Sequence, residues 1–134
     1  MRARRVQVGA LPHDRPKRQE KDALLKSFAC GATRVLVATD AALLALADGL
    51  RPVDHVISFD VPNTMAEYTQ RLAHTGRGGH SGRKTTIVTD SSPKPQLEAL
   101  VDLLQRTDNE VPRWLEWIVT EPSAAAAAEP LDLE

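Results

Sequence analysis

Short apolar runs alternate with segments of helical periodicity along most of this chain. The runs at residues 35–38 and 56–59 are continuous and apolar, which is typical of parallel strands that are covered on both faces. Weaker strand patterns cover residues 6–10 and the β-branched segment 85–89. Apolar residues recur at helical spacing in the segments 18–29, 41–47, 65–73, 97–104 and 111–118. This order predicts an α/β fold with an open, mainly parallel sheet and flanking helices.

Local signals indicate where several of these elements begin and end. Gly31 stands just past the first helical segment as a C-terminal stop. Thr64 and Glu67 have the spacing of a capping box, with Thr64 as the N-cap of the helix that follows. The end of the chain is alanine-rich and low in complexity. We therefore predict a folded domain over residues 1–119 and a disordered tail over residues 120–134.

Two tryptophans, Trp114 and Trp117, lie three residues apart in the last helical segment. Large aromatic side chains at helical spacing are usually part of a core, so we expect both to pack on the domain. The alternative is that they stack on nucleic-acid bases.

The length of 134 residues and a hydrophobic content of 42% are those of one globular domain. No apolar run approaches the roughly 20 residues of a membrane-spanning helix, and the start of the chain lacks the apolar core of a signal peptide. We therefore expect an intracellular protein of the cytoplasm or nucleus, without a membrane partner. The single cysteine, Cys30, and the scattered histidines predict no metal site.

The charges are distributed unevenly along the chain. Residues 1–89 carry 14 Lys and Arg against 8 Asp and Glu, whereas residues 90–134 carry 3 against 10. A basic front half could face a polyanion such as a nucleic acid or a nucleotide. A solvated charged surface would give the same count, so this pattern leaves both interpretations open.

The candidate chemistry lies beyond the carboxyl ends of the strands, where open α/β sheets bind their ligands. Thr39 and Asp40 follow one buried strand, and a loop rich in glycine and arginine follows the helix at residues 65–73. Flexible backbone amides and guanidinium groups are suited to phosphate. An exposed basic turn is the alternative for this loop.

Three ordered blocks of sequence resemble the second RecA-like domain of the DEAD-box RNA helicases. They are RVLVATD (residues 34–40), VDHVISFDVP (53–62) and EYTQRLAHTGRGGHSGRKTT (67–86). The resemblance extends upstream into VGALPHDRPKRQEKDALLKSF and downstream into ALVDLLQRTDNEVPRWLE, which is similar to the end of the domain in the Vasa-like subgroup. It covers about residues 6–119.

The resemblance implies a domain that closes over ATP together with a first RecA-like domain and clamps one RNA strand. Binding to RNA phosphates would make recognition of single-stranded RNA independent of sequence. The implied RNA contacts are Thr39, Asp40, Arg83 and Lys84. Arg77 would be an arginine finger at the γ-phosphate, while the ATP and interdomain surface would include Arg71, Gln70, Asp48 and Gly76.

Two departures from the family pattern affect the expected activity. The first of the two family arginine fingers falls on His74, and an imidazole does not reproduce a permanently charged, bidentate guanidinium. The family text ARGLD is replaced by ALLALADGL (residues 42–50), in which Asp48 is the displaced counterpart of a ribose-binding aspartate.

Several motifs of the family are absent from this sequence. The phosphate-loop lysine and the Asp-Glu-Ala-Asp motif belong to the first RecA-like domain, and the opening strand and helix of the second domain are also missing. We therefore expect ATP and Mg²⁺ to bind only together with a first domain, and no ATPase activity from this chain alone.

Three hypotheses follow for the function. The chain is a fragment of an ATP-dependent RNA helicase, or a catalytically inactive domain that binds RNA or another helicase subunit, or a truncated gene product.

Overall fold

The computed structural model describes residues 5–11, 17–46 and 49–121. Strands and helices alternate through most of them, in the order β1 (Val8–Ala10), α1 (Arg18–Ala29), β2 (Val35–Val37), α2 (Asp40–Leu46), β3 (His55–Ser58), α3 (Met65–Leu72), β4 (Arg83–Thr86), α4 (Lys94–Arg106) and α5 (Arg113–Thr120). Each predicted element has a counterpart, although β4 begins two residues before the predicted strand. Asp48 and residues 122–134 of the predicted tail lie outside the described residues.

The α/β class with parallel strands and flanking helices is confirmed, but the strands pair as two sheets. The described strands form a two-stranded sheet of β1 and β2 and another of β3 and β4, instead of the single open sheet that we predicted. The chain likewise divides into two compact units, Met1–Val56 with Thr69–Thr85 and Ile57–Tyr68 with Thr86–Glu134. The prediction of a missing strand stays a prediction.

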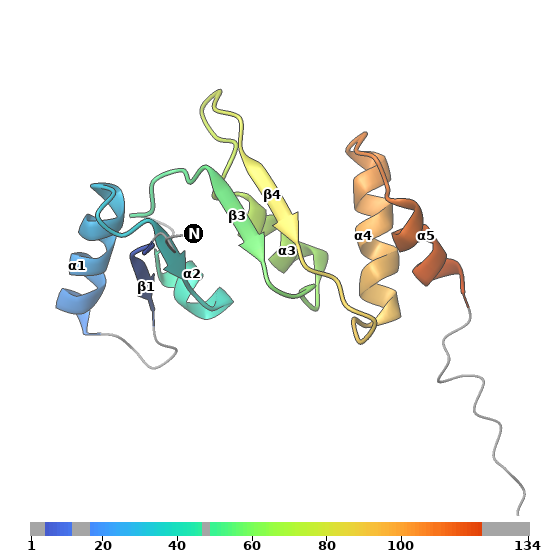
Figure 1. Cartoon of the computed structure of the whole chain (residues 1–134), viewed down its shortest axis with the longest axis horizontal. Helices are drawn as coiled ribbons and strands as arrows, with labels where there is room; N and C mark the ends of the chain where they lie inside the picture. Colours follow the sequence, from blue (N-terminus) through green and yellow to red (C-terminus); the bar gives the residue numbers. More distant parts are fainter. Residues whose placement is uncertain (1–4, 12–16, 47–48, 122–134) are drawn as a thin grey trace, which may run out of the picture. The chain divides into compact units, whose positions relative to one another are not determined.

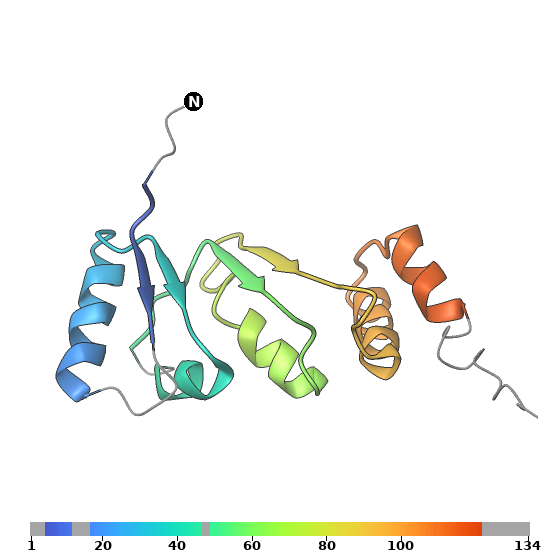
Figure 2. The ribbon, with the colours of Figure 1, turned by 60° about the horizontal axis from the view of Figure 1, so that its bottom comes forward.

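The first sheet is parallel, with Val8 opposite Val35 and Ala10 opposite Val37 (Figure 2). Helix α1 packs on one face of this sheet. A Cβ atom at Gly9 would lie 2.3 Å from the end of the Leu24 side chain of α1, so the strand and the helix approach closely at this glycine.

The second sheet joins β3 and β4, which run in the same direction in Figure 1. The backbone N–H of Arg83 donates to the Asp54 carbonyl oxygen (2.9 Å). Four residues further along each strand, the N–H of Ile87 donates to the Ser58 carbonyl oxygen (2.9 Å). The equal spacing on both strands is the register of a parallel pair.

The apolar strands are less buried than their composition predicted. Val37 at the end of β2 is 54% exposed, and Phe59 just after β3 is 83% exposed. We expected these runs to be covered on both faces, and that prediction is wrong. Val35 and Ile57 are exposed as well.

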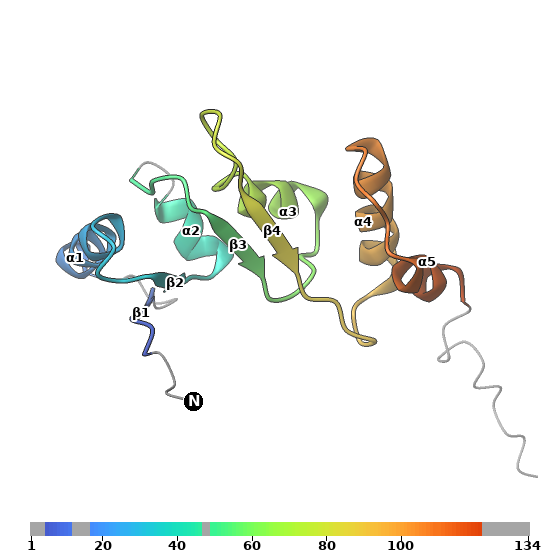
Figure 3. The ribbon, with the colours of Figure 1, turned by 45° about the horizontal axis from the view of Figure 1, so that its top comes forward.

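Helices α4 and α5 pack against each other in the second unit (Figure 3). Their buried side chains are Leu97 and Leu100 of α4 and Leu115 of α5. Trp114 and Trp117 are 52% and 64% exposed, so the prediction that they pack on the domain is wrong. Leu115 takes the inward direction of α5, and helical geometry turns both tryptophans away from it.

The predicted helix ends are confirmed. The Thr64 hydroxyl accepts from the Glu67 N–H (3.2 Å), and a Glu67 carboxylate oxygen accepts from the Thr64 N–H (3.3 Å), which completes the capping box of α3. Gly31 follows α1 with φ of 82°, the left-handed conformation that favours glycine. None of the described helices is both long and apolar enough to span a membrane.

Candidate functional site

Thr39 connects the end of β2 to the start of α2. Its hydroxyl oxygen accepts from the Ala42 N–H (3.3 Å), and its carbonyl oxygen accepts from the Leu43 N–H (2.8 Å). Thr39 is therefore the N-cap of α2. Asp40 is the first residue of the helix, where the positive end of the helix dipole favours a carboxylate.

Asp40 forms a bidentate ion pair with Arg71, which lies in the last turn of α3. Arg71 donates from Nε to Oδ1 (2.6 Å) and from Nη2 to Oδ2 (2.7 Å). The Arg71 side chain is 15% exposed and that of Asp40 is 43% exposed. The hydrogen bonds from Arg71 lower the pKa of Asp40, against the opposing effect of burial. The pair ties the end of β2 to α3, and both residues belong to the first unit.

The Asp40→Asn variant should remove an acid-dependent part of the stability. Because the folded-state pKa of Asp40 lies below its ordinary value of 3.8, the ionised pair stabilises the fold above that value and this contribution is lost as the pH falls through the folded-state pKa. We expect a loss of about 1 kcal/mol at pH 7, since the pair is partly exposed. Urea unfolding at pH 7 and pH 3 measures the difference in the free energy of unfolding between the parent chain and the Asp40→Asn variant.

The control for this prediction is Asp22→Asn, which changes an exposed carboxylate of α1 that forms no ion pair among the described residues. This variant should unfold like the parent chain at both pH values. An equal loss of stability in both variants would show that the Asp40 pair has no special role.

His74 is a buried residue just after α3. Its side chain is largely enclosed, with 7% of the residue exposed, and its carbonyl oxygen accepts from the Val53 N–H (2.9 Å). Burial lowers the pKa of His74, and the positive charge of Arg77 lowers it further. The imidazole is therefore held towards its neutral form, so His74 supplies less positive charge than an ordinary histidine.

Arg77 lies in an exposed loop of residues 76–82. The loop turns through a hydrogen bond from the His80 N–H to the Arg77 carbonyl oxygen (3.1 Å). Gly76, Gly78 and Gly79 have φ values of 71°, 63° and 80°, which side chains disfavour. Arg77 forms no ion pair among the residues that the structure describes, so its guanidinium is available to an anion.

Thr75 holds the base of this loop, a role that the sequence did not reveal. It is 3% exposed, and its hydroxyl donates to the Val53 carbonyl oxygen. Gly82 returns against it so closely that a Cβ atom there would lie 2.0 Å from the Thr75 hydroxyl and 2.5 Å from the Gly76 nitrogen. We call this contact between Thr75 and Gly82 the clasp. Threonine and glycine are common in loops, so the clasp is identified only by the contact between these two residues, which are seven positions apart.

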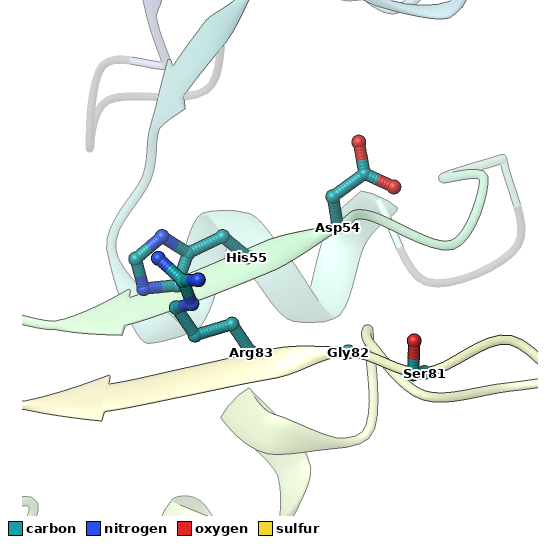
Figure 4. Close-up of a pocket in the computed structure, with 5 residues that line it drawn as sticks. All are labelled: Asp54, His55, Ser81, Gly82 and Arg83. Carbon is teal, nitrogen blue, oxygen red and sulfur yellow. The ribbon is translucent and has the colours of Figure 1, made fainter.

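Arg83 and Lys84 follow the loop at the start of β4, and both are exposed. Arg83 lines a hollow of about 470 Å³ together with Asp54, His55, Ser81 and Gly82. In Figure 4, Asp54 and Ser81 project in the same direction, while the Arg83 side chain extends from β4 towards His55 on β3. His55 Nε2 also forms a hydrogen bond with the Thr85 hydroxyl (2.8 Å).

The structure brings some of the predicted site residues together and leaves others apart. Asp40, predicted to contact RNA, and Arg71, predicted to contact the partner domain, are bound to each other. Gln70 is exposed on α3, and Gly76 begins the loop that presents Arg77. The roles assigned to these residues stay predictions.

The family model for the helicase conserved C-terminal domain matches residues 2–79, which is more than half of the chain. The chain belongs to this family. Together with the similar proteins and structures below, the match makes it a C-terminal domain of the DEAD-box RNA helicase type.

Two relatives show how much of a helicase this domain represents. The chain is 37% identical over 114 residues to the ATP-dependent RNA helicase DDX4 of Mus musculus, a match that covers 85% of this chain and 16% of that protein. It is 37% identical over 111 residues to the ATP-dependent RNA helicase glh-3 of Caenorhabditis elegans, covering 82% of this chain and 15% of that protein. The domain thus spans about a sixth of the length of these curated relatives.

Two solved structures have a similar fold. The yeast DEAD-box splicing factor Prp28 superimposes with a TM-score of 0.74 at 20% identity, covering 88% of this chain and 27% of that chain. The C-terminal domain of the DEAD-box protein Dbp5 superimposes with a TM-score of 0.59 at 28% identity, covering 78% of this chain and 59% of that chain. The RecA-like fold of the helicase C-terminal domain is therefore confirmed.

The ligands of the family can be compared with the residues present here. Arg77 is an exposed guanidinium that fits a phosphate group. Among the described residues, no group of three or more His, Cys, Asp or Glu side chains could hold a metal ion. The contacts of this domain to ATP and Mg²⁺ stay predictions.

Proposed function

We propose that this helicase C-terminal domain forms one half of a clamp that binds ATP and single-stranded RNA. A first RecA-like domain would form the other half. The observation that supports the proposal most strongly is the ion pair between Asp40 and Arg71, because it joins two segments with different expected ligands. Thr39, which precedes Asp40, is expected near RNA, and the loop after α3 is expected near ATP.

On the ATP side, Arg77 would stabilise the charge that develops on the γ-phosphate. Its place in an exposed loop and its lack of an ion pair among the described residues support this role. ATP and Mg²⁺ would bind only when the first domain supplies the phosphate-loop lysine and the magnesium ligand. The chemistry of ATP hydrolysis therefore belongs to the assembled pair of domains.

On the RNA side, Arg83 and Lys84 would contact phosphates and bind any sequence. Thr39 would contribute through the N-terminal end of α2. The carboxylate of Asp40 is occupied by Arg71, and a carboxylate repels phosphate. We therefore assign Asp40 an indirect role, in which it holds Thr39 and α3 in place.

A second function is favoured by His74. The neutral tendency of this buried histidine would weaken the stabilisation of the transition state at the first arginine-finger position. A domain that binds RNA or another helicase subunit without ATP turnover would tolerate this loss. Separate measurements of RNA affinity and ATP turnover distinguish this function from the first one.

The affinity of the chain for single-stranded RNA should depend strongly on salt and on the cations of the proposed surface. A uridylate oligonucleotide is titrated at several KCl concentrations, with the parent chain and with the Lys84→Ala and Arg83→Ala variants. Each phosphate contact that is lost should reduce the slope of log K against log salt by about 0.7. Fluorescence anisotropy of a labelled oligonucleotide measures the slopes.

Arg106→Ala is the matched control, because Arg106 forms an ion pair with Asp102 on α4 (3.0 Å) and lies outside the proposed surface. This variant should keep the parent slope. Binding that is insensitive to salt, or a slope that none of the variants changes, would refute the proposed RNA contact.

A further inference from the structure

Two hollows lie at the base of the loop at residues 76–82, which also carries the exposed Arg77. Beside the hollow lined by Asp54, His55, Ser81, Gly82 and Arg83 lies a second hollow of about 360 Å³. Its lining residues are Arg51, Pro52, Val53, Asp54, Gly76, His80 and Ser81. The two hollows adjoin at Asp54 and Ser81, which line both of them, and we call them together the loop-base hollow. All of its residues belong to the first unit.

The charge of the loop-base hollow is predominantly basic. Two arginines and two histidines line it, while Asp54 is the one carboxylate among the residues that line it. Arg51 and Arg83 form no ion pair within the described part of the chain. Two guanidinium groups without a carboxylate partner are suited to an oxyanion, which each can bind through two parallel hydrogen bonds.

The frame of the hollow is held by contacts between distant parts of the chain. Thr75 donates to the Val53 carbonyl oxygen, and Arg83 donates from its N–H to the Asp54 carbonyl oxygen. Gly82 fits against Thr75 without room for a side chain. The segment with Val53 and Asp54 is thus fastened to both ends of the loop.

We propose that the loop-base hollow binds a phosphate group, with Arg51 and Arg83 as the charged donors and the Ser81 hydroxyl as a neutral donor. The phosphate could belong to an RNA strand or to a free phosphate ester. RNA as the source of the phosphate rests on the proposed function. The site itself rests on the hollow and the charges of its lining residues. Asp54 weakens the binding of the anion by repulsion and so limits its affinity.

The site is tested by substitutions that should change the affinity for phosphate in opposite directions. Inorganic phosphate is titrated into the full chain, and the backbone amide signals of Ser81, Gly82 and Arg83 are followed by NMR. Arg83→Gln and Arg51→Gln should each weaken binding about fivefold, because each removes one positive charge close to the anion. Asp54→Asn should strengthen binding by a similar factor, since it removes the repulsion. A misfolded variant would not bind phosphate more tightly, so the Asp54→Asn arm separates the site from loss of the fold.

Arg34→Gln serves as the control, because Arg34 is exposed just before β2 and does not line the hollow. Its affinity for phosphate should equal that of the parent. If the Arg34 variant weakens binding as much as the Arg83 variant, or if Asp54→Asn leaves the affinity unchanged, the site is refuted.

A second arm distinguishes the source of the phosphate. A uridylate oligonucleotide that displaces inorganic phosphate and binds more tightly to the Asp54→Asn variant identifies RNA as the ligand. Displacement by uridine monophosphate but not by the oligonucleotide identifies a free phosphate ester and retains the site. If neither phosphate binding nor RNA binding responds to Arg51→Gln and Asp54→Asn, while Lys84→Ala still weakens RNA binding, the site is overturned and the proposed function stands.

Discussion

The His74→Arg variant should raise ATP turnover by about 10²-fold or more when this domain is combined with a first RecA-like domain and RNA. Arginine fingers contribute roughly 10³–10⁵ to the rate in the GTPases where they have been removed and restored. The resemblance to the family predicts that His74 occupies the first arginine-finger position, and burial and Arg77 hold the pKa of His74 below its usual value. Steady-state ATP hydrolysis with saturating RNA measures the gain.

The same substitution carries a cost in the isolated chain. His74 is almost fully buried, and a permanent positive charge there must leave water and lie near Arg77. We expect a lower Tm for the variant alone and a recovery of Tm when ATP and the first domain are added, because the phosphates then compensate the charge.

His74→Lys is the matched control, since it restores the charge without the planar, bidentate guanidinium. It should recover less turnover than His74→Arg. Adding Arg77→Ala to the His74→Arg variant should remove most of the gain. If His74→Arg folds, binds RNA and hydrolyses ATP no faster than the parent, the assignment of His74 to a lost finger is wrong.

The Gly82→Ala variant should disorder the loop at residues 76–82 and weaken phosphate and RNA binding together. The added Cβ would lie 2.0 Å from the Thr75 hydroxyl and 2.5 Å from the Gly76 backbone nitrogen, and the backbone atom has little room to move. Overpacking of this kind costs about 1–3 kcal/mol. Hydrogen exchange at the Arg83 amide, which donates to Asp54, measures whether the base of the loop has opened.

Gly49→Ala is the matched control for this substitution. Gly49 does not have a positive φ, and the nearest atom to its added Cβ would be a Leu25 methyl at 3.4 Å, an ordinary contact. This variant should keep the exchange rate at Arg83 and the affinity for RNA. Equal exchange in Gly82→Ala and the parent would show that the clasp between Thr75 and Gly82 does not hold the loop.

Much of the fold follows from local patterns in the sequence. The capping box at Thr64 and Glu67 and the helix stop at Gly31 were predicted correctly, because the groups involved lie within a few residues of one another. The burial of the strands was predicted wrongly. A run of apolar residues shows that a strand can be covered, but the number of helices that cover it depends on the whole chain, and Phe59 remains 83% exposed.

The candidate site shows the same division. Arg71, Arg77, Arg83 and Lys84 could be selected from the sequence because guanidinium and ammonium groups among glycines are suited to phosphate. The clasp at Thr75 could not be selected, since its partners are a carbonyl oxygen at Val53 and a glycine at position 82. Neither partner has a side-chain signature.

The sequence by itself determined the order and type of the elements and the helicase family, and it predicts the departure at His74, since spacing and residue identity carry all of these. The tertiary structure alone decided that Asp40 binds Arg71, that burial lowers the pKa of His74, and that the loop-base hollow exists. The physical reason is distance along the chain. Asp40 and Arg71 are 31 residues apart, and their ion pair forms only after β2, α2 and α3 have come together.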